Sequence, residues 1–294
     1  MSIPPAFRRL VDDAAIFPPG LAPRADAVVA HAGHAGSGHR DFVGPFVVDI
    51  DRLGELAELA TTALFPTGLR VSVVVPSPHD LPSAVRTAHE AEHLDLAGLE
   101  VKLEADTPVT EQIREIASTQ RHGASTYVEA PRPGDARWCD VLDHVVQADL
   151  RLKFRTGGTE AGAFPSESEL ATWVCDAVAR AVRFKCTAGL HQAVRHTDAA
   201  TGFEHHGYLN VLLATARAVT GAEPRQVEAV VAQRDARTLA REVADTSWHV
   251  MSLAREAFTS YGSCSILEPL QDLAELHLLS LEVDIPPATS GAHQ

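Results

Sequence analysis

Lysine is the residue type in this sequence whose scarcity and placement most suggest chemistry. Of the 25 basic residues, 22 are arginine and three are lysine, namely Lys102, Lys153 and Lys185. Arginine stays protonated, whereas a lysine removed from water can lose its proton and attack a carbonyl carbon. All three lysines lie in apolar, strand-like runs. We therefore expect an amine nucleophile that forms a Schiff base.

Two of these lysines, Lys153 in LRLKFRTGG and Lys185 in VRFKCTAGLH, are each followed by small residues. If they end consecutive parallel strands, which lie roughly 4.8 Å apart, their amines meet at the carboxyl-terminal mouth of a barrel. Each ammonium group then disfavours protonation of the other, and burial acts in the same direction. This predicts a neutral amine near pH 7. The alternative is that each lysine pairs with a buried carboxylate such as Glu104 or Glu129.

The elements that must position the lysines alternate between short β-branched runs and amphipathic helical patterns, which is typical of parallel βα units. We expect eight strands, at 10–17, 44–50, 69–75, 99–103, 126–130, 150–155, 183–187 and 258–264. Expected helices cover 51–64, 80–92, 110–119, 136–146, 166–182 and 267–279. This pattern predicts an α/β fold, a single (β/α)8 TIM-barrel domain over residues 1–286, with a disordered tail at 287–294.

The expected seventh and eighth strands are separated by a long insertion, residues 188–257. It contains a His-rich loop at 195–207 and an apolar segment at 208–219, and we expect a lid or an oligomer contact there. A Gly-, His- and Ala-rich stretch at 31–40 is expected to be a loop. Ser166, with Glu169 three residues later, is typical of a helix N-cap.

Bulk composition limits the class of partner. The chain is 45% hydrophobic and 22% charged, with a formal net charge of −14, so a polyanion such as nucleic acid or an anionic membrane surface would be repelled. No apolar run is long enough for a transmembrane helix, and the four cysteines show no CxxC spacing. We expect a cytoplasmic homodimer with free thiols that acts on a small molecule and uses no cofactor or metal.

Three motifs, in order, resemble those of the class I deoxyribose-phosphate aldolases. KFRTGG at 153–158 resembles the family's K-T-S-T-G, which carries the Schiff-base lysine, and KCTAG at 185–189 resembles V-K-x-x-G-G, which carries the second lysine. YGSCSIL at 261–267 resembles the phosphate-holding segment F-G-A-S-S-L-L. The resemblance covers about residues 145–275.

The resemblance implies a TIM-barrel carbon–carbon lyase of the aldolase type. Lys153 would be the nucleophile and Lys185 the cation that lowers its pKa. The family's catalytic aspartate matches Lys102 here, so Glu104 or Glu129, or Asp12 or Asp13 from the first strand, would supply the carboxylate. A third lysine at the mouth indicates an anionic carbonyl substrate, carboxylated or phosphorylated. The expected substrate-binding residues are Arg155, Thr156, Gly157, Gly189, His191, Gly262, Ser263, Ser265 and Asp13.

Two other hypotheses remain open at this stage. The first is a metal-dependent lyase or hydrolase, because His and carboxylate side chains bind divalent metals and four histidines lie in one region: His191, His196, His205 and His206. The second is a non-catalytic binding protein on an aldolase scaffold, which predicts that both lysines are held in salt bridges with no cavity beside them. Cys186 and Cys264 are expected to be small core residues rather than reactive thiols.

Overall fold

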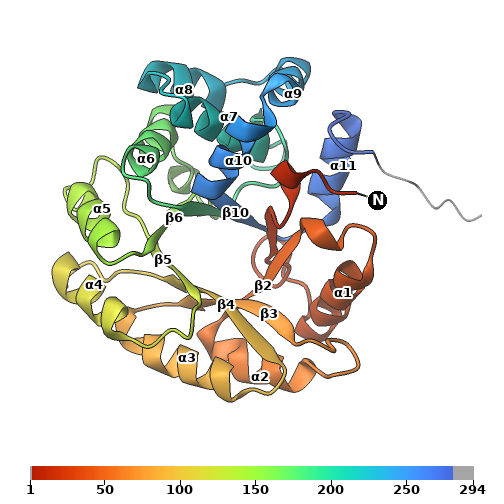
Figure 1. The fold of residues 1–294 in the computed structure, drawn as a ribbon, viewed down its shortest axis with the longest axis vertical. Helices are drawn as coiled ribbons and strands as arrows, with labels where there is room; N and C mark the ends of the chain where they lie inside the picture. The colour runs from red at the N-terminus through yellow and green to blue at the C-terminus, as the bar shows by residue number, and fades with distance from the viewer. Residues whose placement is uncertain (1, 281–294) are drawn as a thin grey trace, which may run out of the picture.

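Eight parallel strands close into a barrel in the computed structural model, which describes residues 2–280. Each barrel strand pairs with its neighbour in the chain, and the last pairs with the first (Figure 1). The barrel strands are β1 (Val11–Asp13), β2 (Val43–Asp49), β3 (Leu69–Val75), β4 (Leu94–Val101), β5 (Ser125–Glu129), β6 (Arg151–Arg155), β7 (Phe184–Thr187) and β10 (Phe258–Ser263). The predicted (β/α)8 barrel is confirmed.

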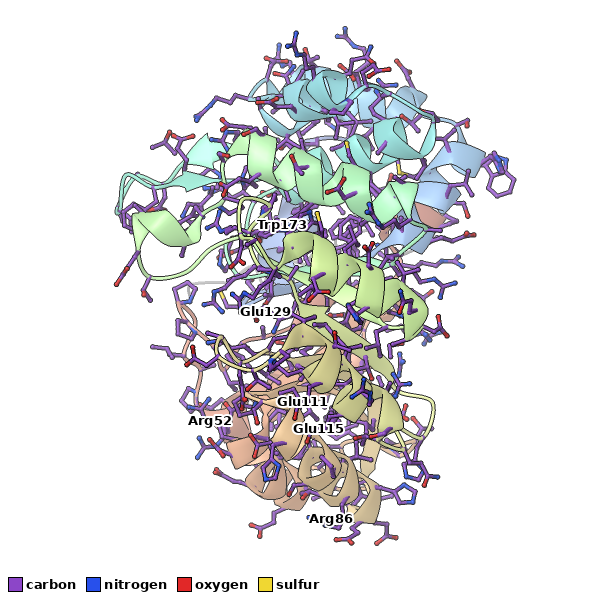
Figure 2. All side chains as sticks on the ribbon, turned by 90° about the vertical axis from the view of Figure 1, so that its left-hand side faces the viewer. Arg52, Arg86, Glu111, Glu115, Glu129 and Trp173 are labelled. Carbon is purple, nitrogen blue, oxygen red and sulfur yellow. The ribbon has the colours of Figure 1, made fainter. Side chains whose placement is uncertain are left out.

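Helices follow the strands and cover the outside of the barrel (Figure 1). They are α1 (Arg24–Gly36), α2 (Leu53–Leu59), α3 (Leu81–Glu90), α4 (Val109–Ser118), α5 (Trp138–Gln147), α6 (Glu167–Ala179) and, after the last strand, α11 (Leu267–Glu275). Each buries one apolar face, as an amphipathic pattern requires. In α4, Ile113 and Ile116 face the core while Glu111 and Glu115 lie on the exposed face (Figure 2).

The start of α6 is fixed by the capping box that its sequence predicts. The Ser166 hydroxyl accepts a hydrogen bond from the Glu169 backbone N–H at 3.2 Å, and the Glu169 carboxylate accepts one from the Ser166 N–H at 2.8 Å. Two backbone donors at the helix end are satisfied in this way. The helix after β6 therefore begins at a defined residue, which also fixes the loop between Lys153 and the helix.

The insertion between β7 and β10 is built mainly from helices. A two-stranded hairpin, β8 (His196–Thr197) with β9 (Glu204–His205), precedes α7 (Tyr208–Val219), α8 (Pro224–Val231), α9 (Ala236–Asp245) and α10 (Trp248–Ala257). Figure 1 shows α8 and α9 outside α7 and α10. All side chains of α7 from Tyr208 to Ala216 are buried. The apolar segment is therefore a helix of the core and not a lid, and the expectation of an oligomer contact in the insertion stays a prediction.

The predicted loop at 31–40 is also wrong in part, because α1 continues to Gly36. Ala27, Val28 and His31 are buried at helical spacing, and alanine is the best helix former. That periodicity outweighs the two glycines of the segment that lie in α1, Gly33 and Gly36. The expected tail at 287–294 lies outside the described residues. None of the helices in the described part of the chain has the length and apolar character that crossing a membrane requires.

Candidate active site

Lys153 and Lys185 lie side by side inside the barrel, as the sequence predicts. They occupy paired positions on β6 and β7, and their exposed fractions are 3% and 1%. The interior of a TIM barrel is ordinarily filled by branched apolar side chains. Two ammonium groups at one level must therefore be balanced by buried opposite charge.

Two carboxylates from distant strands hold Lys185. Its ammonium donates to Asp12 on β1 and to Glu100 on β4, both at 2.5 Å. The Ser260 hydroxyl donates to the same oxygen of Asp12, and the Ser72 hydroxyl to the same oxygen of Glu100, both at 2.8 Å. All five side chains are buried. Lys185 is therefore fixed in position by a satisfied network that crosses the barrel.

Lys153 has a more accessible partner. Its ammonium lies 2.9 Å from Glu129 Oε2 and 3.5 Å from Glu100 Oε2. The Glu129 side chain is 17% exposed, whereas that of Lys153 is 4% exposed and that of Glu100 is 1% exposed. Figure 2 shows Glu129 at mid-height in the molecule, below Trp173 of α6 and above Glu115 of α4. Of the two lysines, Lys153 is the one whose partner reaches the solvent.

The carboxylates decide the charge of Lys185. Burial lowers the pKa of Lys185, but Asp12 and Glu100 outweigh it, so the pKa lies well above the ordinary value. Burial raises the pKa of Glu100, but Lys185 and Lys153 bring it down to about 2. Burial raises the pKa of Asp12. The expectation that the two cations keep each other neutral is therefore wrong for Lys185, because opposite charges at 2.5 Å outweigh the neighbouring like charge.

The ends of β4 and β6 add positive charge near Glu129. Lys102 and Arg155 are both exposed and lie just after and at the end of these strands. Burial raises the pKa of Glu129, but Lys153, Arg155 and Lys102 outweigh it and lower that pKa. Lys102 is thus outside the buried network, and its effect there is electrostatic.

Glu100 is the carboxylate that lies between the two lysines. The sequence did not predict this role, because the motif comparison matched the family's acidic residue to Lys102. Glu104 is exposed and accepts a hydrogen bond from Thr107 at 2.9 Å, outside the lysine network. The sequence does contain an indication of Glu100, because it is a carboxylate inside the apolar strand Leu94–Val101. It lies on the same strand face as Lys102, two residues earlier and so farther inside the barrel.

The two aspartates of β1 point to opposite sides of the strand. Asp12 reaches Lys185, whereas Asp13 Oδ2 lies 2.9 Å from His31 Nδ1 on α1. The other oxygen of Asp13 accepts from the Ala15 backbone N–H at 3.1 Å. Of the two carboxylates that the sequence offered from the first strand, Asp12 joins the lysines and Asp13 does not.

The loops after β6 and β7 touch one another. The Thr156 hydroxyl donates to the carbonyl of Ala188 at 2.5 Å. A Cβ on Gly157 would lie 2.8 Å from the Gly189 Cα, and Gly189 has a φ of +77°. These predicted substrate-binding residues therefore also have a structural task, which is to let the two lysine-bearing strands end side by side.

The predicted anion-binding segment after β10 is partly engaged in its own turn. The Ser263 hydroxyl accepts from the Ser265 N–H, and the Ser265 hydroxyl accepts from the Glu268 N–H, both at 3.2 Å. Gly262 is buried on β10. His191 Nδ1 lies 3.4 Å from Cys264 Sγ, and burial raises the pKa of the thiols of Cys264 and Cys186. Raised thiol pKa values fit the expectation of unreactive cysteines.

The four histidines of the metal hypothesis do not form a metal site in the described part of the chain. His196 and His205 face each other across the β8–β9 hairpin with ring centroids 5.2 Å apart. His206 is buried elsewhere, with Nε2 2.7 Å from the Pro165 carbonyl and Nδ1 3.0 Å from Arg195. Among residues 2–280, no group of three or more His, Cys, Asp or Glu side chains is arranged to hold a metal ion. These residues do not fit the metal-dependent alternative.

The arrangement as a whole provides an amine, a carboxylate in contact with it, and a fixed cation beside both. Compared with known proteins, the chain matches no family model and no curated protein. Its function must therefore be inferred from the chemistry of this site.

Proposed function

We propose that the protein is a class I, Schiff-base-forming carbon–carbon lyase that acts on a small anionic carbonyl compound, with Lys153 as its nucleophile. The observation that carries the proposal is the contact of the Lys153 amine with Glu129, 2.9 Å away, beside a second lysine that stays cationic. A nucleophilic lysine needs a base to take its proton, and a partly exposed carboxylate in direct contact meets that need.

The chemistry follows from these contacts. Glu129 takes a proton from Lys153, and the free amine adds to the substrate carbonyl to give a carbinolamine. Protonation of its hydroxyl group by Glu129 and loss of water give an iminium ion, which withdraws electrons from the bond between the α and β carbons. Glu129, again a carboxylate, takes the proton of the substrate's β-hydroxyl group, which becomes the carbonyl of the leaving product as the Cα–Cβ bond breaks and its electron pair forms an enamine on Lys153. Return of the proton to the enamine carbon gives the second product as an imine, and its hydrolysis frees the lysine amine. Lys185, held by Asp12 and Glu100, remains a fixed cation beside the reacting amine.

The positive charges around the strand ends support an anionic substrate. Lys102 and Arg155 are exposed and close enough to Glu129 to lower its pKa. Arginine and lysine side chains in such a position attract a carboxylate or a phosphate group. The site is similar in this respect to that of the class I deoxyribose-phosphate aldolases. The family's catalytic aspartate is matched by Lys102 in the sequence, and we propose that Glu100 takes its place.

A non-catalytic barrel is the competing hypothesis, and one of its expectations is met because both Lys153 and Lys185 lie in ion pairs. The two hypotheses differ in whether Lys153 reacts. A structural lysine held by Glu129 and Glu100 would not add to a carbonyl.

Borohydride trapping tests the proposal. The chain has three lysines, so a trapped imine is assigned by peptide mass with little ambiguity. We expect sodium borohydride with a small aldehyde or ketone acid to add mass to the peptide that contains Lys153. Lys153→Arg should abolish this label, whereas Lys102→Arg, the exposed control, should keep it. Labelling of neither protein, or equal labelling of wild type and Lys153→Arg, would contradict the imine mechanism.

A further inference from the structure

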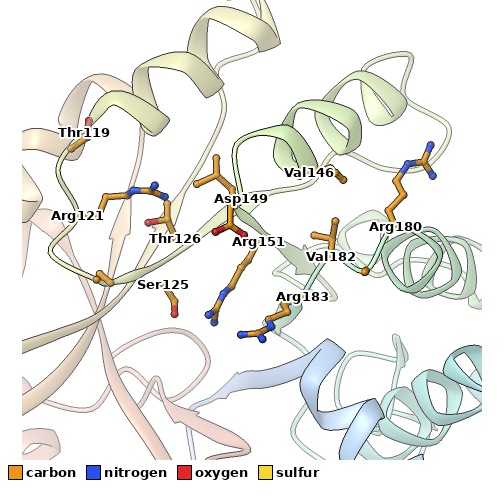
Figure 3. Close-up of a pocket in the computed structure, with 14 residues that line it drawn as sticks. Thr119, Arg121, Ser125, Thr126, Val146, Asp149, Arg151, Arg180, Val182 and Arg183 are labelled. Carbon is orange, nitrogen blue, oxygen red and sulfur yellow. The ribbon is translucent and has the colours of Figure 1, made fainter.

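A cavity lies at the amino-terminal end of the barrel, opposite the end that carries the lysine site. Its volume is about 670 Å³, and it is formed by the starts of β5, β6 and β7 and the loops before them (Figure 3). The lysine site uses side chains farther along these strands, so the two sites are separate. An amino-terminal cavity has no part in the lyase chemistry proposed above.

The charge of this cavity is opposite to that of the protein as a whole. Four arginines and one aspartate line it, namely Arg121, Arg151, Arg180, Arg183 and Asp149. Counting one charge for each gives +3, in a chain whose formal net charge is −14. Several positive charges in one cavity repel one another unless carboxylates or a bound anion neutralise them.

Three of the four arginines have no carboxylate partner in the described part of the chain. Arg180 lies 3.3 Å from Asp143. Within residues 2–280, no carboxylate lies within 4.0 Å of the guanidinium groups of Arg121, Arg151 or Arg183. The positive charge of the cavity is therefore available to a ligand.

Two of the arginines that line the cavity lie side by side on neighbouring strands. The backbone N–H of Leu152 donates to the Arg183 carbonyl at 3.0 Å, which places Arg151 and Arg183 beside each other at the starts of β6 and β7. Figure 3 shows their guanidinium groups next to one another with the Ser125 hydroxyl on the same side. Arg151 is held in place, because its Nη1 donates to the Tyr127 hydroxyl at 3.0 Å.

A buried hydroxyl group also belongs to the wall of the cavity. Thr126 is 3% exposed and lines the cavity, and its hydroxyl has no hydrogen-bond partner among residues 2–280. A buried hydroxyl without a partner is unfavourable by itself. Figure 3 shows the Arg121 side chain extended toward Thr126.

We infer that this amino-terminal cavity binds a small, multiply charged phosphate-bearing anion. Guanidinium groups match phosphate oxygens with paired hydrogen bonds, and the three arginines without a carboxylate partner in the described residues suit a diphosphate or a phosphate ester. The arginines line a hollow large enough to surround such a molecule, which favours a small anion over an acidic protein surface. The inference does not depend on the lyase proposal.

Calorimetric titration with inorganic pyrophosphate at constant ionic strength tests the inference. We expect saturable binding at one site, and binding about tenfold weaker for Arg183→Gln and for Arg121→Gln, as expected for loss of one charged hydrogen bond. Neither side chain has a hydrogen-bond partner in the described residues, and circular dichroism checks that both variants fold.

Arg70→Gln is the matched control. Arg70 is at the start of β3, at the same end of the barrel, and is paired with Asp95 at 3.3 Å. We expect this variant to bind pyrophosphate as tightly as the wild type. Absence of saturable binding to the wild type, or an equal loss of affinity in Arg70→Gln, would overturn the assignment of this cavity.

Discussion

Glu100 faces both lysines with one carboxylate, because its Oε1 accepts from Lys185 at 2.5 Å while its Oε2 lies 3.5 Å from Lys153. The two strands that carry the lysines are thus connected through a residue from β4, on another part of the barrel wall. This arrangement makes Glu100 the common partner of two buried cations. Removing its charge would take one carboxylate partner away from each of the two buried ammonium groups.

Glu100→Gln should destabilise the protein strongly. The substitution keeps the shape of the side chain but removes the negative charge, and breaking a buried ion pair in this way costs about 3–5 kcal/mol. Urea denaturation monitored by circular dichroism measures the loss. Glu104→Gln is the control four residues later, on an exposed side chain, and should change the free energy of unfolding by no more than about 0.5 kcal/mol. Similar effects of the two substitutions would show that Glu100 is not the partner described above.

His206 predicts a dependence of stability on pH. Burial is the main cause that lowers its pKa, to about 4 from the ordinary 6.5. Arg195 donates to Nδ1, so the neutral ring carries its proton on Nε2 and donates to the Pro165 carbonyl. A second proton, on Nδ1, would point at the N–H group that Arg195 donates to this atom. Because the folded-state pKa is depressed, the unfolded chain binds more protons between pH 6.5 and 4, and stability is lost as the pH falls through this window.

The expected size of this loss is on the order of 3 kcal/mol, because the pKa of His206 falls from the ordinary 6.5 to about 4. Denaturation midpoints measured from pH 7 to pH 4 should fall less steeply in His206→Gln than in the wild type. His79→Gln, at a side chain that is 89% exposed, is the control and should keep the wild-type slope. Parallel slopes for all three proteins would exclude His206 as the origin.

The sequence was sufficient for the barrel and the lysine pair, and insufficient for their partners. Apolar β-branched runs located all eight strands. Lys153 and Lys185 were recognised because a charged side chain inside such a run is buried, which is unfavourable unless the charge is paired or takes part in function. The same reasoning applies to Glu100, but residues 100 and 102 share a strand face, and only the end of β4 at Val101 decides which is buried. Where β4 ends depends on how it pairs with the neighbouring strands, and the local sequence pattern contains no information on that pairing.

Adjacent carboxylates raise a similar difficulty. Asp12 and Asp13 follow each other on β1, so one must face the barrel interior and the other a helix. The sequence does not tell which, because the strand has only three residues and all are buried. The answer comes from Ser260 and His31, which provide partners from β10 and α1 for Asp12 and Asp13 respectively.

Gly189→Ala should cost about 2–3 kcal/mol of unfolding free energy. Its φ is +77°, which L side chains rarely adopt, and the added Cβ would lie 2.8 Å from the Thr156 carbonyl oxygen. Gly262→Ala is a matched control on β10, because its Cβ would meet Thr187 and Ala14 at 3.7 and 3.8 Å, which are ordinary contacts. Thermal denaturation compares the two. A Gly262→Ala variant as unstable as Gly189→Ala would contradict the assignment of the loss to the positive φ and the close contact at Gly189.

Glu129→Ala should slow imine formation at Lys153 without preventing folding. If Glu129 accepts the lysine proton, its loss should lower the rate about 10²–10⁴-fold, the usual contribution of a positioned base. The rate is measured by quenching an aldehyde reaction with borohydride at timed intervals and quantifying the Lys153 peptide. The side chain is 17% exposed, so a small molecule can enter the space that it leaves.

Added formate distinguishes a proton acceptor from a residue that merely positions the lysine. A free carboxylate can take the proton in place of Glu129, so formate should raise the rate of the Glu129→Ala variant in a concentration-dependent way and leave the wild type unchanged. Glu104→Ala serves as the control and should react at the wild-type rate with or without formate. A Glu129→Ala variant that is slow and unaffected by formate would assign Glu129 to positioning Lys153, and one that reacts at the wild-type rate would remove Glu129 from the mechanism.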